Sequence, residues 1–120
     1  TLVLALSYSA RWEIIRAARE LARKAASGQI QPEEINEELF SSHLSTAGIP
    51  DPDLLIRTGG DMRVSNFLLY QIAYTELIVT PTYWPDYSRE DFRNDIATYQ
   101  HRQRRFGKTG EQVSENEDTK

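Results

Sequence analysis

The sequence contains no cysteine, which excludes disulfides, thiolate metal sites and cysteine nucleophiles and fits a reducing compartment. It also has no excess of positive charge: 14 Lys and Arg residues and 18 Asp and Glu residues give a net charge of -4. Sequence-independent binding to nucleic-acid phosphates needs a basic protein surface, so we expect no nucleic-acid partner. No apolar run approaches the roughly 18 to 20 residues that cross a bilayer, and no signal-peptide pattern opens the chain. We therefore expect a cytoplasmic protein in which any anion site is local.

The chain has 120 residues, of which 39% are hydrophobic and 27% charged, a composition typical of one folded globular unit. We expect the folded part to comprise residues 1–107. The last thirteen residues, 108–120, read "KTGEQVSENEDTK", contain one apolar residue and are expected to be a disordered polar tail. Because the chain opens directly into the apolar run "LVLALS", we expect it to be a piece of a longer protein.

Four segments of the first half have sequence patterns that predict regular secondary structure. The continuous apolar run Leu2–Leu6 predicts a strand buried on both faces of a parallel sheet. Apolar residues at three- and four-residue spacing predict a helix over Arg11–Ser27. A second helix is predicted from Pro32 to about Leu44, because proline and two glutamates suit a first turn. The short run Leu54–Ile56 predicts another buried strand.

The second half adds a short helix, a strand and a longer helix. Ser65 is a suitable N-cap for a helix through about Gln71, and "ELIVT", which begins at Glu76, predicts a strand. Ser88 and Asp91 form a capping-box pattern for the last helix, whose C-terminal end carries several arginines, Arg102, Arg104 and Arg105. Strands that alternate with helices predict an α/β fold with an open, mainly parallel sheet flanked by helices.

A glycine turn follows the strand that ends at Arg57. Ligands of open α/β sheets bind outside the carboxyl ends of the strands, which is where Arg57 lies. Gly59 and Gly60 allow a sharp turn, and Arg63 precedes the predicted helix start at Ser65, whose free N–H groups would suit a phosphate. Two guanidinium groups can each bind two phosphate oxygens, so the combination favours a diphosphate over a carboxylate.

Other interpretations of these residues remain open at this stage. The arginines could be solvated or could pair with a carboxylate such as Asp53 or Asp61. The glycines match neither a Walker pattern nor GxGxxG, so no nucleotide is indicated. Glu76 enters an apolar strand, where a carboxylate must be exposed at an edge, paired, or bound to a cation. His43 and His101 have no companion histidines at ligand spacing, which favours structural roles.

The segment "DLLIRTGGDMRVSNFLLYQIAYTELIVTPTYWPDYSREDF", followed by "RQRRFG", resembles the C-terminal part of the bacterial cis-prenyltransferases, the undecaprenyl diphosphate synthase (isoprenyl transferase) family. The motifs that carry the resemblance are IRT, RxSNFLL, AYxEL and WPD, in this order. The upstream "LALSYSARWEII" is similar to a strand-and-helix segment of that family, in which asparagine-tyrosine-glycine-glycine-arginine is commoner. The likeness spans about residues 2–107 and implies the C-terminal portion of the undecaprenyl diphosphate synthase fold.

The resemblance implies a transferase that condenses isopentenyl diphosphate repeatedly with an allylic diphosphate, typically farnesyl diphosphate, under Mg²⁺. The long cis-polyprenyl product, such as the undecaprenyl diphosphate used in cell-wall synthesis, would partition to the membrane. Arg57, Arg63, Ser65 and the backbone of Val64 would hold isopentenyl diphosphate, and Glu76 would contribute to the metal site. The enzyme would be a homodimer in which this C-terminal region approaches the partner's active site.

The resemblance also implies what this chain lacks. The family's catalytic aspartate and the residues that set product length lie in an upstream half, so no catalytic residue is expected here and the chain alone should be inactive. Met62 stands where the family often has a histidine near the metal, which puts a metal role at that position in doubt. The alternatives are a non-catalytic partner subunit of a cis-prenyltransferase and a generic phosphate-binding α/β module.

Overall fold

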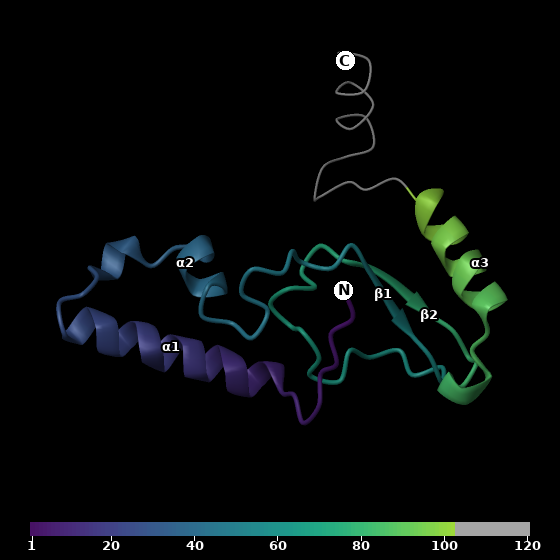
Figure 1. Cartoon of the computed structure of the whole chain (residues 1–120), viewed down its shortest axis with the longest axis horizontal. Coiled ribbons are helices and arrows are strands. Elements are labelled where there is room, and N and C mark those ends of the chain that lie inside the picture. Colours follow the sequence, from purple (N-terminus) through teal and green to yellow (C-terminus); the bar gives the residue numbers. More distant parts are fainter. Residues whose placement is uncertain (103–120) are drawn as a thin grey trace, which may run out of the picture. The chain divides into compact units, whose positions relative to one another are not determined.

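The computed structural model describes residues 1–102, so the predictions for Arg104, Arg105 and the polar tail lie outside the described residues. Along the chain the elements are helix α1, a 3-10 turn, helix α2, strands β1 and β2, a second 3-10 turn and helix α3 (Figure 1). Their bounds are α1 Ala10–Ala26, 3-10 Pro32–Glu34, α2 Glu37–Ser41, β1 Leu54–Arg57, β2 Glu76–Val79, 3-10 Trp84–Asp86 and α3 Arg89–Gln100.

The chain divides into two compact units, each of which is formed by two separate stretches of sequence. The helical unit comprises Thr1–Asp53 and Met62–Thr75 and contains α1 and α2. The strand unit comprises, among the described residues, Leu54–Asp61 and residues 76–102, and contains β1, β2 and α3.

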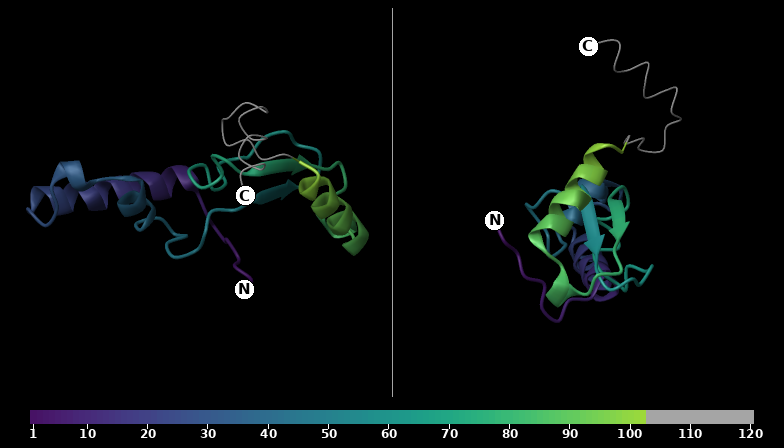
Figure 2. Two further views of the ribbon diagram at one scale, coloured as in Figure 1. Left: turned by 90° about the horizontal axis from the view of Figure 1, so that it is seen from above. Right: turned by 90° about the vertical axis from the view of Figure 1, so that its right-hand side faces the viewer.

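Strands β1 and β2 form a parallel pair, in register from Leu54 opposite Glu76 to Arg57 opposite Val79. Figure 2 shows the two arrows side by side and pointing the same way. Leucine, isoleucine and valine suit a pleated, half-buried surface, and Ile78 is 8% exposed in the centre of β2. The predicted strands at these two positions and their parallel arrangement are confirmed.

The predicted strand at Leu2–Leu6 is wrong. This segment has no regular structure, and Leu2 and Leu6 are 85% and 83% exposed. A buried parallel strand needs hydrogen-bonded neighbours, and within residues 1–102 the sheet consists of β1 and β2 alone. The apolar composition of the segment indicated that it could form a strand, but it did not show whether a neighbouring strand is present for it to pair with.

The 17-residue helix α1 confirms the first predicted helix. The buried positions are Ala10, Glu13, Ala17 and Leu21, whereas Ile15 is 51% exposed. Small residues on this face let the helix backbone approach its neighbours closely. No helix of the described part of the chain is both long and apolar enough to cross a membrane.

The second predicted helix is broken into two short pieces. Residues 32–34 form a 3-10 turn, Ile35 is extended, and α2 starts afresh after Asn36. The Asn36 Oδ1 atom accepts a hydrogen bond from the Leu39 N–H at 2.9 Å, so asparagine acts as a second N-cap inside the predicted helix.

Helix α3 confirms the predicted capping box. The Ser88 hydroxyl accepts from the Asp91 N–H, and the Asp91 carboxylate accepts from the Ser88 N–H at 2.8 Å. The Ser88 hydroxyl also donates to Asp91 Oδ2 at 2.6 Å, and this bond, together with the one from the Ser88 N–H, lowers the pKa of Asp91, because both favour its ionised form. Phe92 of this helix is 49% exposed.

The helical unit is organised around the carboxylate of Glu13, which is fully buried. It accepts hydrogen bonds from the Tyr8 hydroxyl, from the Ser45 backbone N–H at 2.9 Å and from Gln71 Nε2 at 3.0 Å. Burial alone would raise the pKa of Glu13, but these hydrogen bonds outweigh it and the pKa lies below its ordinary value. Burial, together with the bond to Glu13, raises the pKa of Tyr8. One ionised side chain thus joins three segments that are far apart in the sequence.

We expect Glu13→Gln to destabilise the chain by about 1 to 3 kcal/mol at neutral pH, because an amide would direct its own donors at groups that already donate. A lowered pKa contributes stability above the ordinary glutamate value of about 4.3 and loses it as pH falls through the lowered value. The stability lost on acidification should therefore be smaller in Glu13→Gln. Urea unfolding at several pH values between 3 and 7 measures both effects.

Glu20→Gln is the matched control on the same helix. Glu20 lies 3.9 Å from Arg16 in a partly exposed pair, which typically contributes less than about 1 kcal/mol. Equal stability of Glu13→Gln and Glu20→Gln at neutral pH would contradict the central role of Glu13.

Candidate functional site

Arg57 ends β1 in the strand unit, at the carboxyl end of a parallel strand where the sequence predicted a ligand site. One guanidinium nitrogen lies 3.1 Å from Asp61 Oδ2, and the side chains of Arg57 and Asp61 are 27% and 47% exposed. Among residues 1–102, the buried Arg57 Nε atom has no hydrogen-bond partner. Because the Arg57 side chain is partly exposed, the end of its guanidinium group, and not the buried Nε, is the part that an oxyanion could reach.

The turn after Arg57 depends on two glycines with left-handed backbone, Gly59 at φ +87° and Gly60 at φ +78°. Space alone does not require glycine there, since an added Cβ would meet neighbours only at ordinary contact distances of 3.7 Å. The N–H groups of both glycines are bonded, to the carbonyls of Thr82 and Thr80 at 2.9 Å. The turn therefore redirects the chain after Arg57, as predicted, but these two N–H groups are already engaged.

Glu76, the predicted metal ligand, begins β2 and forms an ion pair with Arg102. Arg102 donates to Glu76 Oε2 at 2.9 Å and to the Leu77 carbonyl at 3.0 Å, and the Glu76 side chain is 27% exposed. Of the alternatives left open by the sequence, the structure thus shows the paired carboxylate.

Arg57 and Glu76 lie at opposite ends of the strand pair. Because Glu76 is in register with Leu54, three residues before Arg57, the two are separated by roughly 10 Å along the strand axis. Side chains alternate between faces with a period of two, so Arg57 projects to the face opposite Glu76. The structure does not bring these two predicted site residues together.

The remaining predicted ligands, Arg63, Val64 and Ser65, belong to the helical unit. Arg63 and Ser65 are exposed, and Val64 is half-buried. The predicted helix from Ser65 is wrong, since residues 65–71 form successive turns. Ser65, Asn66 and Leu68 have positive φ of 47°, 62° and 47°, whereas an N-cap residue has extended backbone. The phosphate site expected at that helix start is therefore absent from the structure.

Left-handed backbone at a residue other than glycine costs on the order of 1 to 3 kcal/mol and persists where surrounding contacts hold it. Here the contacts come from Asn66, which sequence reasoning missed. Its carbonyl accepts from the Ala10 N–H at 3.1 Å and its Oδ1 from the Arg11 N–H at 2.9 Å. Asparagine tolerates this conformation better than most residues, which was the available signal.

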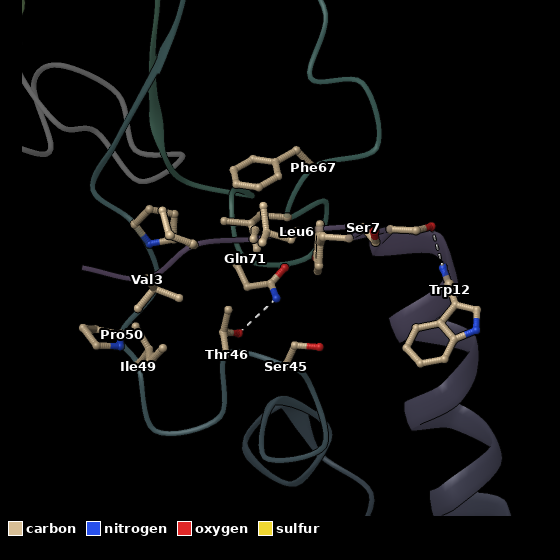
Figure 3. Close-up of a pocket in the computed structure, with 16 residues that line it drawn as sticks. Val3, Leu6, Ser7, Trp12, Ser45, Thr46, Ile49, Pro50, Phe67 and Gln71 are labelled. Atoms are coloured by element: carbon tan, nitrogen blue, oxygen red, sulfur yellow. Dashed lines mark hydrogen bonds between the residues drawn. The ribbon is translucent and has the colours of Figure 1, made fainter. Parts of the chain in front are cut away.

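The helical unit also contains a cavity of about 500 Å³ between the N-terminal segment and the loops at 45–52 and 67–71. Figure 3 shows side chains that line this cavity, among them Val3, Leu6 and Gln71, and the hydrogen bond between Gln71 and Thr46. Gln71 is 3% exposed and donates to both Glu13 and Thr46 at 3.0 Å, and its Oε1 has no hydrogen-bond partner among residues 1–102. The cavity is mainly apolar, and none of the predicted ligands lines it.

The described residues offer little for a metal beyond Glu76. Within residues 1–102 no group of three or more His, Cys, Asp or Glu side chains could hold an ion. Mg²⁺ nevertheless often binds through one or two carboxylates together with phosphate oxygens, so Glu76 fits as a contributing ligand. His43 has the structural role expected: its ring nitrogens contact Lys24 Nζ and the Leu39 carbonyl, each at 2.8 Å.

Comparison with known proteins defines the class of this chain. Residues 1–107 match the family model for undecaprenyl diphosphate synthase, a prenyltransferase. The chain belongs to this family, which confirms the resemblance carried by the IRT, RxSNFLL, AYxEL and WPD motifs.

Individual relatives agree with the family. An isoprenyl transferase of Porphyromonas gingivalis is 60% identical over 95% of this chain and 45% of its own length. A farnesyl-diphosphate-specific ditrans,polycis-undecaprenyl-diphosphate synthase of Pseudomonas putida is 50% identical over 93% of this chain and 45% of its own length. The crystal structure of lavandulyl diphosphate synthase from Lavandula x intermedia, in complex with dimethylallyl diphosphate, superposes with a TM-score of 0.83 at 42% identity, over 88% of this chain and 45% of that one. The chain thus spans about half the length of the relatives it matches, with the α/β fold that the sequence predicted.

Proposed function

We propose that this chain is the C-terminal, isopentenyl-diphosphate-binding part, about residues 1–107, of a prenyltransferase that makes a long-chain cis-polyprenyl diphosphate. The observation that carries this proposal is Arg57, a partly exposed guanidinium at the carboxyl end of a parallel strand, in a chain of this family. Arg63, Ser65 and the Val64 backbone are the other ligands that we propose for the same substrate.

In this reaction the diphosphate leaves the allylic carbon while the double bond of isopentenyl diphosphate attacks that carbon and a proton is lost. Residues of this chain would hold the isopentenyl diphosphate and orient its double bond, without taking part in the bond changes. Positioning of this kind lowers the barrier, because a bimolecular step becomes effectively unimolecular. Mg²⁺, when bound, would neutralise diphosphate charge.

We propose that Glu76 contributes one carboxylate to the Mg²⁺ site and that this site is shared between two copies of the chain. Within one chain, Arg57 and Glu76 project to opposite faces of the strand pair, roughly 10 Å apart along the strand. A diphosphate held by Arg57 would therefore meet a cation at Glu76 of the partner copy. A homodimer satisfies this requirement with a self-complementary interface.

We further propose that the complete enzyme acts in the cytoplasm at the membrane surface, because each added isoprene unit makes its product more apolar. Cell fractionation with a tagged protein would check this location.

The substrate assignment is tested by Arg57→Ala and Arg63→Ala in the complete enzyme. We expect each to raise the KM for isopentenyl diphosphate by at least about tenfold, because a hydrogen bond to a charged group contributes about 1.5 to 3 kcal/mol. The KM for the allylic diphosphate should change less than about twofold. Steady-state kinetics with each substrate varied in turn provides the measurement.

Arg93→Ala and Arg19→Ala remove the same charge from exposed positions of α3 and α1 and serve as matched controls. Equal effects of Arg57→Ala and Arg63→Ala on both substrates would refute the assignment.

The shared metal site is tested by Glu76→Gln. We expect the Mg²⁺ concentration that gives half-maximal rate to rise at least about tenfold, because loss of groups at a metal site typically costs that much. Glu90→Gln, an exposed position of α3, is the charge-matched control.

A hybrid dimer then separates a shared site from a site within one chain. A purified dimer of one Glu76→Gln and one Arg57→Ala copy retains one intact shared site, so about half the wild-type activity per dimer is expected. If the site lies within one chain, both sites of the hybrid are damaged and activity stays at the level of the single variants.

The 120-residue chain alone should be inactive, because the proposed ligands bind a substrate and none supplies the chemistry at the allylic carbon. Radiolabelled isopentenyl diphosphate with farnesyl diphosphate and Mg²⁺ gives a sensitive test. Any elongated product from the purified chain would contradict this prediction.

A further inference from the structure

Asn66 connects the proposed substrate-binding turn to the first turn of α1, although 55 or more residues separate them in the sequence. Its carbonyl accepts from the Ala10 N–H, its Oδ1 accepts from the Arg11 N–H, and its Nδ2 donates to Ser9 Oγ at 2.9 Å. All three contacts lie within the helical unit. Asn66 therefore caps α1 from a distant part of the chain.

The cap leaves little of the helix start available to a ligand. The first N–H groups of a helix have no partner inside the helix. In α1, Asn66 takes those of Ala10 and Arg11, and Ser9 Oγ takes that of Trp12 at 3.3 Å. The helix start thus serves as an anchor for the turn and not as an anion site.

The turn itself is fixed on both sides of Asn66. Ser65 and Asn66 are both left-handed, and the Phe67 N–H donates to the Val64 carbonyl at 3.1 Å, which closes the turn. The Phe67 ring packs edge-on against Tyr8, with 5.6 Å between the ring centroids. Tyr8 in turn donates to Glu13, so the anchor continues into the buried hydrogen-bond network of α1.

We propose that Asn66 is a positioning residue for isopentenyl diphosphate: by capping α1 it holds the left-handed turn that presents Ser65 to the diphosphate. The inference rests on the proposed function and deepens it. Asn66 needs no contact with the substrate, because its carbonyl, Oδ1 and Nδ2 are all directed at α1. Ser9, whose hydroxyl binds both Asn66 and the Trp12 N–H, is part of the same anchor.

The test uses Asn66→Ala, Asn66→Gly, Ser65→Ala and the double variant Asn66→Ala/Ser65→Ala in the complete enzyme. We expect Asn66→Ala to raise the KM for isopentenyl diphosphate about tenfold and that for the allylic diphosphate less than about twofold. Asn66→Gly keeps the left-handed backbone and the hydrogen bond that the residue 66 carbonyl accepts from the Ala10 N–H, so its KM for isopentenyl diphosphate should rise less than that of Asn66→Ala. It also provides a folded variant should Asn66→Ala fail to fold.

The double variant separates positioning from stability. If Asn66 acts by placing Ser65, Asn66→Ala should change the KM less than about twofold once Ser65 is already alanine, because coupled residues are not additive. Asn36→Ala is the matched control, since it removes an asparagine cap of the same chemistry from α2. Its expected effect is lower thermal stability with an unchanged KM.

The outcomes distinguish the two proposals. A normal KM for isopentenyl diphosphate in Ser65→Ala and Arg63→Ala would overturn the proposed function, and the positioning role with it. A raised KM in Ser65→Ala, together with an Asn66→Ala variant that loses only stability, as Asn36→Ala does, would overturn the positioning role alone. Effects of Asn66→Ala and Ser65→Ala that multiply in the double variant would overturn it as well.

Discussion

A buried carboxylate must be met by donors, and this requirement at Glu13 determines much of the helical unit. Leaving an ionised group unpaired away from water costs several kcal/mol, so the fold places three donors around it. Those donors come from Tyr8, Ser45 and Gln71, and together they join the N-terminal segment, the loop after α2 and the turns after Phe67. The orientation of α1 follows, with Glu13 and two alanines inward and Ile15 outward.

The fixed position of α1 explains how a strained turn can persist. Ser65 and Asn66 occupy left-handed backbone at a cost on the order of 1 to 3 kcal/mol each, with no glycine to relieve it. Each hydrogen bond that Asn66 makes to α1 contributes only about 0.5 to 1.5 kcal/mol, so several are needed to offset that cost. The three contacts of Asn66, together with the Tyr8–Phe67 ring pair, supply them.

Local patterns predicted the local structure well. The capping box at Ser88, the two short apolar strands and the glycine turn each depend on residues adjacent in sequence, and each is confirmed. The Leu2–Leu6 strand and the Ser65 helix were wrong because their conformations depend on partners far along the chain. The site was predicted only in part. The sequence placed Arg57 correctly at a strand end, but that Arg57 and Glu76 project from opposite faces follows only from the register of the two strands.

Two of the proposed site residues are already neutralised by the chain. Arg57 pairs with Asp61, and Glu76 pairs with Arg102, in partly exposed contacts that each contribute less than about 1 kcal/mol. A diphosphate carries several charges and can bind a guanidinium through two oxygens, so it competes favourably with a single carboxylate. Binding of the proposed ligands at either residue would therefore be an exchange of partners, in which Asp61 gives up its contact with Arg57 or Arg102 gives up its contact with Glu76. Because the released side chains are already partly hydrated, the exchange needs no opening of a buried core.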